Sequence, residues 1–391
     1  MDYREMFPYL KETPTIYLNH AATSPLPTPV VKAVSYYLHE RSAGKINFWQ
    51  EDWEVVERCR EKIAAFINTT PDRIALMHNT SSGIQILAQG LPWQPGDEIL
   101  MIDQEFPANV YPYRALETMG VRVRLLPAPD GQSTPELFSQ YISERTRAIV
   151  VSAVQFLSGY RTPLTALRRL CDQYGCWLLV DAIQAVGSIQ IDVQQTPVDA
   201  LVAGGQKWMM SPHGTGFLYV SEALQAQLHR TPFSWLSVPD PWDFFRYDQE
   251  PVPQARQFEA ATLNYPGFYG MEAALDLLLH ISPAVIEQRI AHLVQYLQEQ
   301  LQEIESVKLY TPEDPELRAG ILTIQVGENE VQAKAVAKFC MEHGVHIAYR
   351  SGKIRFSPHF YNTPDEIDRA VRIFQKGLDT VIQQPVAASG G

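Results

Sequence analysis

The sequence has few cysteines, no basic cluster and no long apolar run, and each of these absences excludes a class of protein. Its 391 residues include four cysteines, whose spacing fits neither a metal site nor a dense disulfide framework, so we expect no metal ion. Lysine and arginine total 32 against 44 aspartate and glutamate, a net charge of −12, so we expect no nucleic-acid partner. No apolar stretch approaches the ~20 residues that cross a bilayer, and no apolar signal core follows the charged N-terminus. We therefore expect a cytoplasmic protein with no membrane partner.

The chain is instead rich in short apolar segments that alternate with helical patterns. A hydrophobic fraction of 46% and a charged fraction of 19% are typical of a globular protein with a large core. Apolar residues recur at helical spacing in 27–43, 52–68 and 164–174. The alternation predicts an α/β fold, in which helices flank a mainly parallel seven-stranded sheet. The predicted strands are 74–77, 98–102, 122–126, 148–154, 176–180, 200–203 and 216–220.

The domain organisation is predicted from the same patterns. We expect an N-terminal arm over 1–18, a large domain over 19–264 and a smaller α+β domain over 265–391. A long amphipathic helix over 285–305 connects to the smaller domain, and residues 384–391 are typical of a disordered tail. In the smaller domain we predict strands at 320–326, 345–349 and 353–356, followed by a helix from Pro364.

Lys207 and Asp181 are the most informative residues. Lys207 lies between two apolar runs, where burial would lower the pKa of its amine and favour the neutral form that makes a Schiff base. Asp181 ends the apolar strand 176–180, and an anion there suits the ring nitrogen of a pyridinium cofactor. The pair indicates a site for pyridoxal 5′-phosphate (PLP). Taken singly, an aspartate at a strand end is usually a turn or cap, and a lone lysine is usually a surface charge.

A second group of small polar residues opens a predicted helix. Thr80 and Ser81 lie in the segment 79–83, where a helix N-terminus and hydroxyl groups favour a bound phosphate. The same residues serve equally well as a helix N-cap.

Together these segments resemble the class V aminotransferase family, which includes cysteine desulfurases, isopenicillin N epimerase-like proteins and kynureninase. The resemblance extends from about residue 16 to about residue 375, and it implies PLP-dependent transferase fold type I. It also implies PLP as cofactor, a small amino acid as substrate, and a homodimer with shared active sites. The resemblance implies that Lys207 forms the Schiff base and acts as the catalytic base, that Asp181 contacts the ring nitrogen, and that Gln184 contacts the phenolic oxygen. It implies that Phe106 stacks on the ring and that the phosphate is bound by Thr80, Ser81 and Gln206, with Thr262 reaching the phosphate of the neighbouring subunit. Arg355 would bind the substrate carboxylate, and Ala21 and His20 would line the substrate side of the pocket.

Two of these positions keep a second interpretation. His20 is either an acid/base group or a packing residue, and Arg355 alone could be a surface arginine. The aromatic segment 232–247 is either a hydrophobic specificity wall or a dimer contact.

Departures from the family pattern bear on the reaction. Residues 348–355 contain no cysteine, although persulfide-forming desulfurases need one just before the carboxylate-binding arginine. Phe106 stands where desulfurases have a histidine, and Phe156 replaces an asparagine. We therefore expect an external aldimine, removal of the Cα proton by Lys207, and then β-elimination of the C–S lyase type or transamination. An amino-acid epimerase is the alternative, followed by a catalytically silent PLP-fold binding protein.

Overall fold

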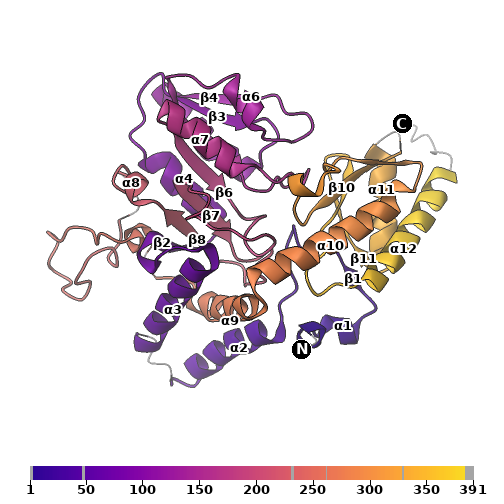
Figure 1. The fold of residues 1–391 in the computed structure, drawn as a ribbon. Coiled ribbons are helices and arrows are strands. Elements are labelled where there is room, and N and C mark those ends of the chain that lie inside the picture. Colours follow the sequence, from indigo (N-terminus) through magenta and orange to yellow (C-terminus); the bar gives the residue numbers. More distant parts are fainter. Residues whose placement is uncertain (1–2, 46–48, 230–232, 261, 328–329, 384–391) are drawn as a thin grey trace, which may run out of the picture.

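A computed structural model describes residues 3–45, 49–229, 233–260, 262–327 and 330–383. A large body carries a central sheet between helices, and a smaller body contains α11, α12 and the strands near the end of the chain (Figure 1). The helices are α1 Tyr9–Glu12, α2 Thr28–Ser42, α3 Gln50–Ile67, α4 Thr80–Gly90, α5 Pro107–Arg114, α6 Pro135–Ser139, α7 Leu164–Tyr174, α8 Glu222–Gln225, α9 Tyr265–Ile281, α10 Pro283–Gln302, α11 Glu330–Glu342 and α12 Pro364–Gln383. The strands are β1 Ile16–Tyr17, β2 Ile74–Met77, β3 Glu98–Ile102, β4 Arg122–Leu126, β5 Thr146–Ser152, β6 Trp177–Asp181, β7 Ala200–Gly204, β8 Gly216–Val220, β9 Val307–Leu309, β10 Leu322–Val326, β11 Val345–His346, β12 Ala348–Arg350 and β13 Lys353–Phe356.

The large sheet has seven strands in the order β2-β8-β7-β6-β5-β3-β4. All neighbours are parallel except β8, which runs antiparallel to both β2 and β7. The predicted α/β fold with a mainly parallel seven-stranded sheet is therefore confirmed. Four strands match their predicted bounds, whereas β5 begins and ends two residues earlier than expected and β6 is shifted by one residue.

The strands form where apolar residues are continuous, because helices cover both faces of the sheet. Every residue of β3, β7 and β8 is buried, and separate apolar clusters lie on the two faces. Short local signals end the helices between the strands. For example, α7 stops at Gly175, whose left-handed φ of 66° lets its N–H reach the Cys171 carbonyl.

The smaller sheet has the order β12-β13-β10-β9, and α11 and α12 pack together beside it. The strand predicted over 345–349 is divided in two, because β11 pairs with β1 while β12 pairs with β13. The short strand β9 was not predicted. Its three residues carry no alternation long enough to stand out from a loop.

The N-terminal arm lies against this smaller body. Strand β1 pairs in parallel with β11, and the Phe7 and Tyr361 rings stack with centroids 3.7 Å apart. The predicted domain boundaries stay predictions, although α9, just after the boundary at 265, packs against α2 and α3. The predicted tail over 384–391 lies outside the described residues. Within the described part of the chain, no helix has the length and apolar character needed to cross a membrane.

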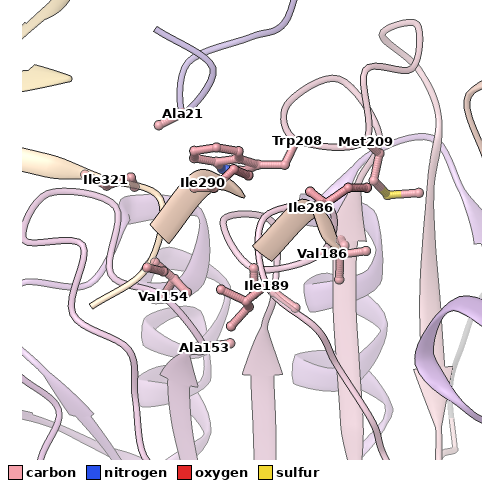
Figure 2. Packing of buried hydrophobic residues seen from close by; sticks show 14 of the residues in the cluster. Ala21, Ala153, Val154, Val186, Ile189, Trp208, Met209, Ile286, Ile290 and Ile321 are labelled. Carbon is pink, nitrogen blue, oxygen red and sulfur yellow. The ribbon is translucent and has the colours of Figure 1, made fainter. Parts of the chain in front are cut away.

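Trp208 connects the arm, the large sheet and α10. Its side chain lies in a buried cluster with Ala21, Ile290 and Ile321 (Figure 2). A Cβ added to Gly320 would come within 2.6 Å of the Trp208 ring, so the indole fills that space completely. Trp208, the residue next to Lys207, therefore packs against three separate parts of the chain.

Candidate active site

The predicted site residues gather where the central strands end. Asp181 is the last residue of β6, Gly204 is the last residue of β7, and Lys207 follows in the next turn. In a parallel sheet the carboxyl ends of neighbouring strands share one edge, which is where α/β proteins bind their ligands. The edge therefore brings together residues that are far apart in the sequence.

The Lys207 amine lies in a desolvated and cationic environment. Part of its side chain stays accessible, but the atoms packed around the amine lower its pKa to about 8. Desolvation is the main cause, Asp181 opposes it, and the guanidinium groups of Arg355 and Arg350 lower the pKa further. A substantial neutral fraction of the amine thus exists near neutral pH.

Asp181 is a buried carboxylate that faces this amine. One oxygen accepts a hydrogen bond from the Ile183 N–H at 2.9 Å. Burial raises its pKa to about 6, against the opposing effects of that N–H and of Lys207. A cation placed beside Asp181 would restore its ionisation, which suits a protonated ring nitrogen.

The Gln184 amide is oriented by its neighbours. Its oxygen accepts from the Trp208 indole N–H at 2.8 Å, and its nitrogen donates to the Ala21 carbonyl at 3.0 Å. A primary amide carries two N–H groups, so one donor remains for a ligand oxygen. This arrangement fits the hydrogen bond to a phenolic oxygen that was predicted for Gln184.

The predicted phosphate residues converge around Gly204. The Thr80 hydroxyl is buried, and the described residues offer it no hydrogen-bond partner. A Cβ built on Gly204 would lie 2.6 Å from the Gln206 side-chain oxygen and 3.1 Å from the Thr80 hydroxyl. Ser81 follows in the first turn of α4, which Asn79 caps by accepting from the Ser82 N–H. The free donors of this turn and the unpaired hydroxyl fit an anion.

Arg355 is a buried arginine rather than a surface residue. It is 2% exposed, and burial lowers the pKa of its guanidinium to about 10. One terminal N–H group donates to the Phe156 carbonyl at 2.6 Å, while its Nε has no partner in the described structure. A buried guanidinium with unpaired donors fits a substrate carboxylate.

Two phenyl rings form a wall beside Lys207. The Phe106 ring lies 5.7 Å from the Lys207 Nζ, and the Phe156 ring meets it edge to face at 5.3 Å. Phe106 is 41% exposed, so its ring remains available for stacking. Neither ring can move a proton.

Both ring nitrogens of His20 are within hydrogen-bonding distance of other protein groups. One ring nitrogen lies 2.8 Å from the Ser357 carbonyl, and the other lies 2.7 Å from the Tyr361 hydroxyl. Complete burial moves its pKa well below the ordinary value. These contacts favour the packing interpretation over an acid/base role. Ala21 bonds to Gln184 and to the Ser357 hydroxyl, which places it at the edge of the site.

Thr262 and the aromatic segment do not join the other site residues. Thr262 is exposed beside η4 Ala255–Phe258 and α9. In the aromatic segment, Trp242 packs against Trp49 with centroids 4.0 Å apart, whereas Phe245 and Tyr247 are 85% and 86% exposed. Residue 232 lies outside the described part of the chain.

Three residues near the site were missed by the sequence reasoning. Arg350 acts on the pKa of both Lys207 and Arg355, and Glu105 and Gln155 form a buried hydrogen-bonded pair next to the phenyl wall. For Glu105 and Gln155, the sequence signal that could have found them is their position directly before Phe106 and Phe156. In the described residues, no group of three His, Cys, Asp or Glu side chains could hold a metal ion.

A mainly parallel seven-stranded sheet with this lysine and aspartate at its carboxyl edge defines a PLP-dependent enzyme of fold type I. The chain belongs to the aminotransferase class-V family, which matches residues 16–370. A probable cysteine desulfurase of Methanothermobacter thermautotrophicus is 31% identical over 388 residues, covering 94% of this chain and 95% of that protein. The uncharacterized aminotransferase YcbU of Bacillus subtilis is 29% identical over 373 residues, with the same coverage of each chain.

Solved structures share the same fold over nearly the whole chain. The cysteine desulfurase of Thermococcus onnurineus NA1 superposes with a TM-score of 0.87 at 25% identity, covering 97% of this chain and 98% of that one. A C-DES mutant with glycine covalently linked to its PLP cofactor superposes with a TM-score of 0.86 at 25% identity, covering 95% and 98%. The unpaired Thr80 hydroxyl, the Gly204 cradle and the facing Lys207 and Asp181 side chains fit this cofactor.

Proposed function

We propose that this enzyme acts on a small amino acid by removing its Cα proton, and that the outcome is β-elimination of the C–S lyase type or transamination. The observation that carries the proposal is the desolvated Lys207 amine, whose lowered pKa responds to the charges of Asp181 and of the buried Arg355. When bound there, PLP supplies an electron sink for the charge that develops at Cα.

Lys207 is the proposed base. Its pKa of about 8 lets the amine take a proton and return it near neutral pH. Phe106 cannot share this work, and His20 has both ring nitrogens engaged. One base favours elimination or transamination over epimerisation, which commonly uses a proton donor on each face of the substrate.

Arg355 is the proposed carboxylate anchor. The Phe156 carbonyl holds one N–H of the guanidinium, so the group enters the reaction already oriented. Its Nε–H, which has no partner in the described residues, would bind the substrate carboxylate. The ring of Phe156 packs edge to face against that of Phe106, so the same residue joins the guanidinium to the phenyl wall.

We do not propose a persulfide-forming desulfurase. Strand β12 ends at Arg350 and β13 begins at Lys353, so a tight turn replaces any long loop that could carry a nucleophilic thiol. Cys340, the cysteine nearest in sequence, is buried in α11, and burial raises the pKa of its thiol to about 12. A thiol in that setting stays protonated and inert.

The proposed assembly is a homodimer in which Thr262 reaches the phosphate site of the partner. Its exposure within one chain supports this arrangement, because the site residues of the same chain leave it unused. We also propose that the protein is cytoplasmic, as predicted from its sequence.

The deciding experiment is a spectral titration of the PLP-loaded protein against a panel of amino acids, with product analysis. Lasting conversion to pyridoxamine phosphate that a 2-oxo acid reverses would identify an aminotransferase. Release of ammonia and a 2-oxo acid would identify a β-lyase, whereas retention of the amino acid with inverted Cα would identify an epimerase. The Lys207→Ala variant is the control and should lose the visible Schiff-base absorbance; persistence of that absorbance would contradict the cofactor assignment.

A further inference from the structure

Glu105 is a buried carboxylate that the proposed reaction does not use. It lies in the turn after β3, directly before Phe106, and it is 6% exposed. Three side chains and one backbone N–H donate to its two oxygens. They are Ser152 N–H at 2.8 Å, Ser152 hydroxyl at 2.6 Å, Gln155 amide at 2.7 Å and Asn109 amide at 3.3 Å.

These donors come from the segments that carry the site. Ser152 ends β5 and pairs in register with Asp181 at the end of β6. Gln155 precedes Phe156, whose carbonyl holds the Arg355 guanidinium and whose ring contacts Phe106. Because Glu105 binds both Ser152 and Gln155, it positions the strand end beside Asp181 and the two phenyl rings. Through Phe156 it also sets the orientation of the Arg355 guanidinium.

The charge of Glu105 also bears on Asp181. Glu105 accepts two hydrogen bonds from Ser152, the strand partner of Asp181, and the Glu105 charge acts to raise the pKa of Asp181. In a low-dielectric interior, an additional anion favours any cation that binds next to it. Glu105 thus adds negative potential at the place where a protonated ring nitrogen would lie.

We propose that Glu105 is a positioning residue for both halves of the site: it orients Arg355 through the Gln155–Phe156 segment, and it strengthens the anionic side of the cofactor pocket behind Asp181. The inference rests on the proposed function and extends it to a residue that touches neither substrate nor cofactor.

Two substitutions separate the shape of Glu105 from its charge. Glu105→Gln keeps the side-chain volume, and rotation of the Ser152 hydroxyl with a flip of the Asn109 amide re-forms the four contacts without the charge. Glu105→Ala removes all four contacts and frees the Gln155 side chain.

The chain offers a matched control in Glu98. It is also buried, at 7% exposed, and it begins β3, so it lies toward the opposite edge of the sheet. There it contacts Arg124 and the Ser143 hydroxyl. Glu98→Gln removes a buried carboxylate of similar burial without touching the site, so it reports a purely structural loss.

For Glu105→Gln we expect the midpoint of the pH-dependent PLP absorbance change to move down by roughly half a pH unit or more. The reason is that the protonated Schiff base and ring nitrogen lose the stabilising effect of a nearby anion. We also expect PLP to dissociate more readily, while KM changes less than about threefold. An absorbance midpoint equal to that of the wild-type protein would overturn the charge role.

For Glu105→Ala we expect KM for the responding amino acid to rise about tenfold or more. Combined with Arg355→Ala, the increase should be far from additive, since both changes act on the same guanidinium. An additive double variant, or a KM equal to that of Glu98→Gln, would overturn the positioning role.

The readouts also distinguish failure of the proposed function from failure of this inference. If the wild-type protein forms no Schiff base with PLP at Lys207, the proposed function fails before any variant is compared. If it does, and both Glu105 variants match Glu98→Gln in PLP dissociation, absorbance midpoint and KM, only the inference fails.

Discussion

The amine of Lys207 lies 5.7 Å from the centre of the Phe106 ring. A phenyl face attracts a cation, whereas burial favours the neutral amine. Burial is the largest influence on the pKa of Lys207, which falls to about 8. Phe106 therefore supplies a surface for stacking and leaves Lys207 to carry the proton.

Replacing Phe106 should weaken cofactor binding without removing the Schiff base. An aromatic pair contributes about 0.5–1.5 kcal/mol, so Phe106→Ala should raise the PLP dissociation constant roughly 2- to 13-fold. Equilibrium dialysis of the apo-protein measures this directly. Tyr111→Ala is a suitable control, because that ring lies on α5, the helix that follows Phe106, but is 69% exposed. Equal affinities for wild type and Phe106→Ala would mean that the ring does not stack on PLP.

The reactivity of the Lys207 amine in the apo-protein should depend on pH. Its pKa is lowered, so the reactive neutral form should rise through pH of about 8, well below the range of an ordinary lysine. Trapping with a small aldehyde and borohydride, followed by peptide mass analysis, gives the profile at this residue. Asp181→Asn should shift the profile to lower pH, because the Asp181 charge raises the pKa of Lys207. Asp192→Asn, away from the site, should leave it unchanged, and a common profile for all three proteins would contradict the assigned electrostatics.

Truncating Arg355 should impair substrate binding more than it impairs folding. A hydrogen bond to a charged group contributes ~1.5–3 kcal/mol, so Arg355→Ala should raise KM tenfold or more. Arg355→Lys should recover part of this loss, since it restores charge without the planar fork. Arg369→Ala is the control, because this exposed arginine donates to the Pro14 carbonyl and not to a site residue among those described. An unchanged KM in Arg355→Ala would remove this residue from the substrate site.

His359 should make the protein less stable in mild acid. Its ring is fully buried, with one nitrogen accepting from the Phe360 N–H and the other donating to the Trp208 carbonyl, and burial lowers its pKa to about 4. Between pH ~6.5 and 4, His359 is protonated in the unfolded chain but neutral in the folded chain. The contribution of this group to the free energy of unfolding is therefore full above this window and falls as the pH drops through it. The loss from this group amounts to about 3 kcal/mol at the lower limit.

Denaturant midpoints across this pH range test the assignment. His359→Gln keeps a donor for the Trp208 carbonyl and removes the titration, so its stability should depend less steeply on pH. His343, an exposed histidine in the smaller body, is the control when changed to Gln. Identical slopes for wild type and His359→Gln would show that this ring does not titrate with unfolding.

Local patterns were sufficient for most of the fold. The run at β8 is apolar and bounded by Gly216, and α7 has a strong apolar stripe that stops at Gly175, so both were predicted with correct bounds. The strand over 345–349 was predicted as one element, because its division depends on which partners β1 and β13 take. Pairing between distant segments has no signature within a short window.

The site was predictable where a residue type has a chemical meaning of its own. Lys207 and Asp181 are recognisable from charges set in apolar runs, and Arg355 was assigned from its resemblance to the family's carboxylate-binding arginine. Glu105 was not, because its importance comes from contacts with Ser152 and Gln155, 47 and 50 residues away. His20 drew attention as a titratable group, but contacts more than 300 residues away occupy both of its nitrogens.

The pairing of the N-terminal arm with the smaller body has a consequence for synthesis on the ribosome. Leu18 bonds to His346 and Ser357, and the Ser24 N–H bonds to the Gln206 carbonyl beside Lys207. The arm and the residues that follow it leave the ribosome well before their partners, because 337 residues separate His20 from Ser357. At about 5–20 residues per second, the arm waits roughly 20–70 s for its partners. The Lys207 turn therefore receives its final support only after the segment around Ser357 has been translated.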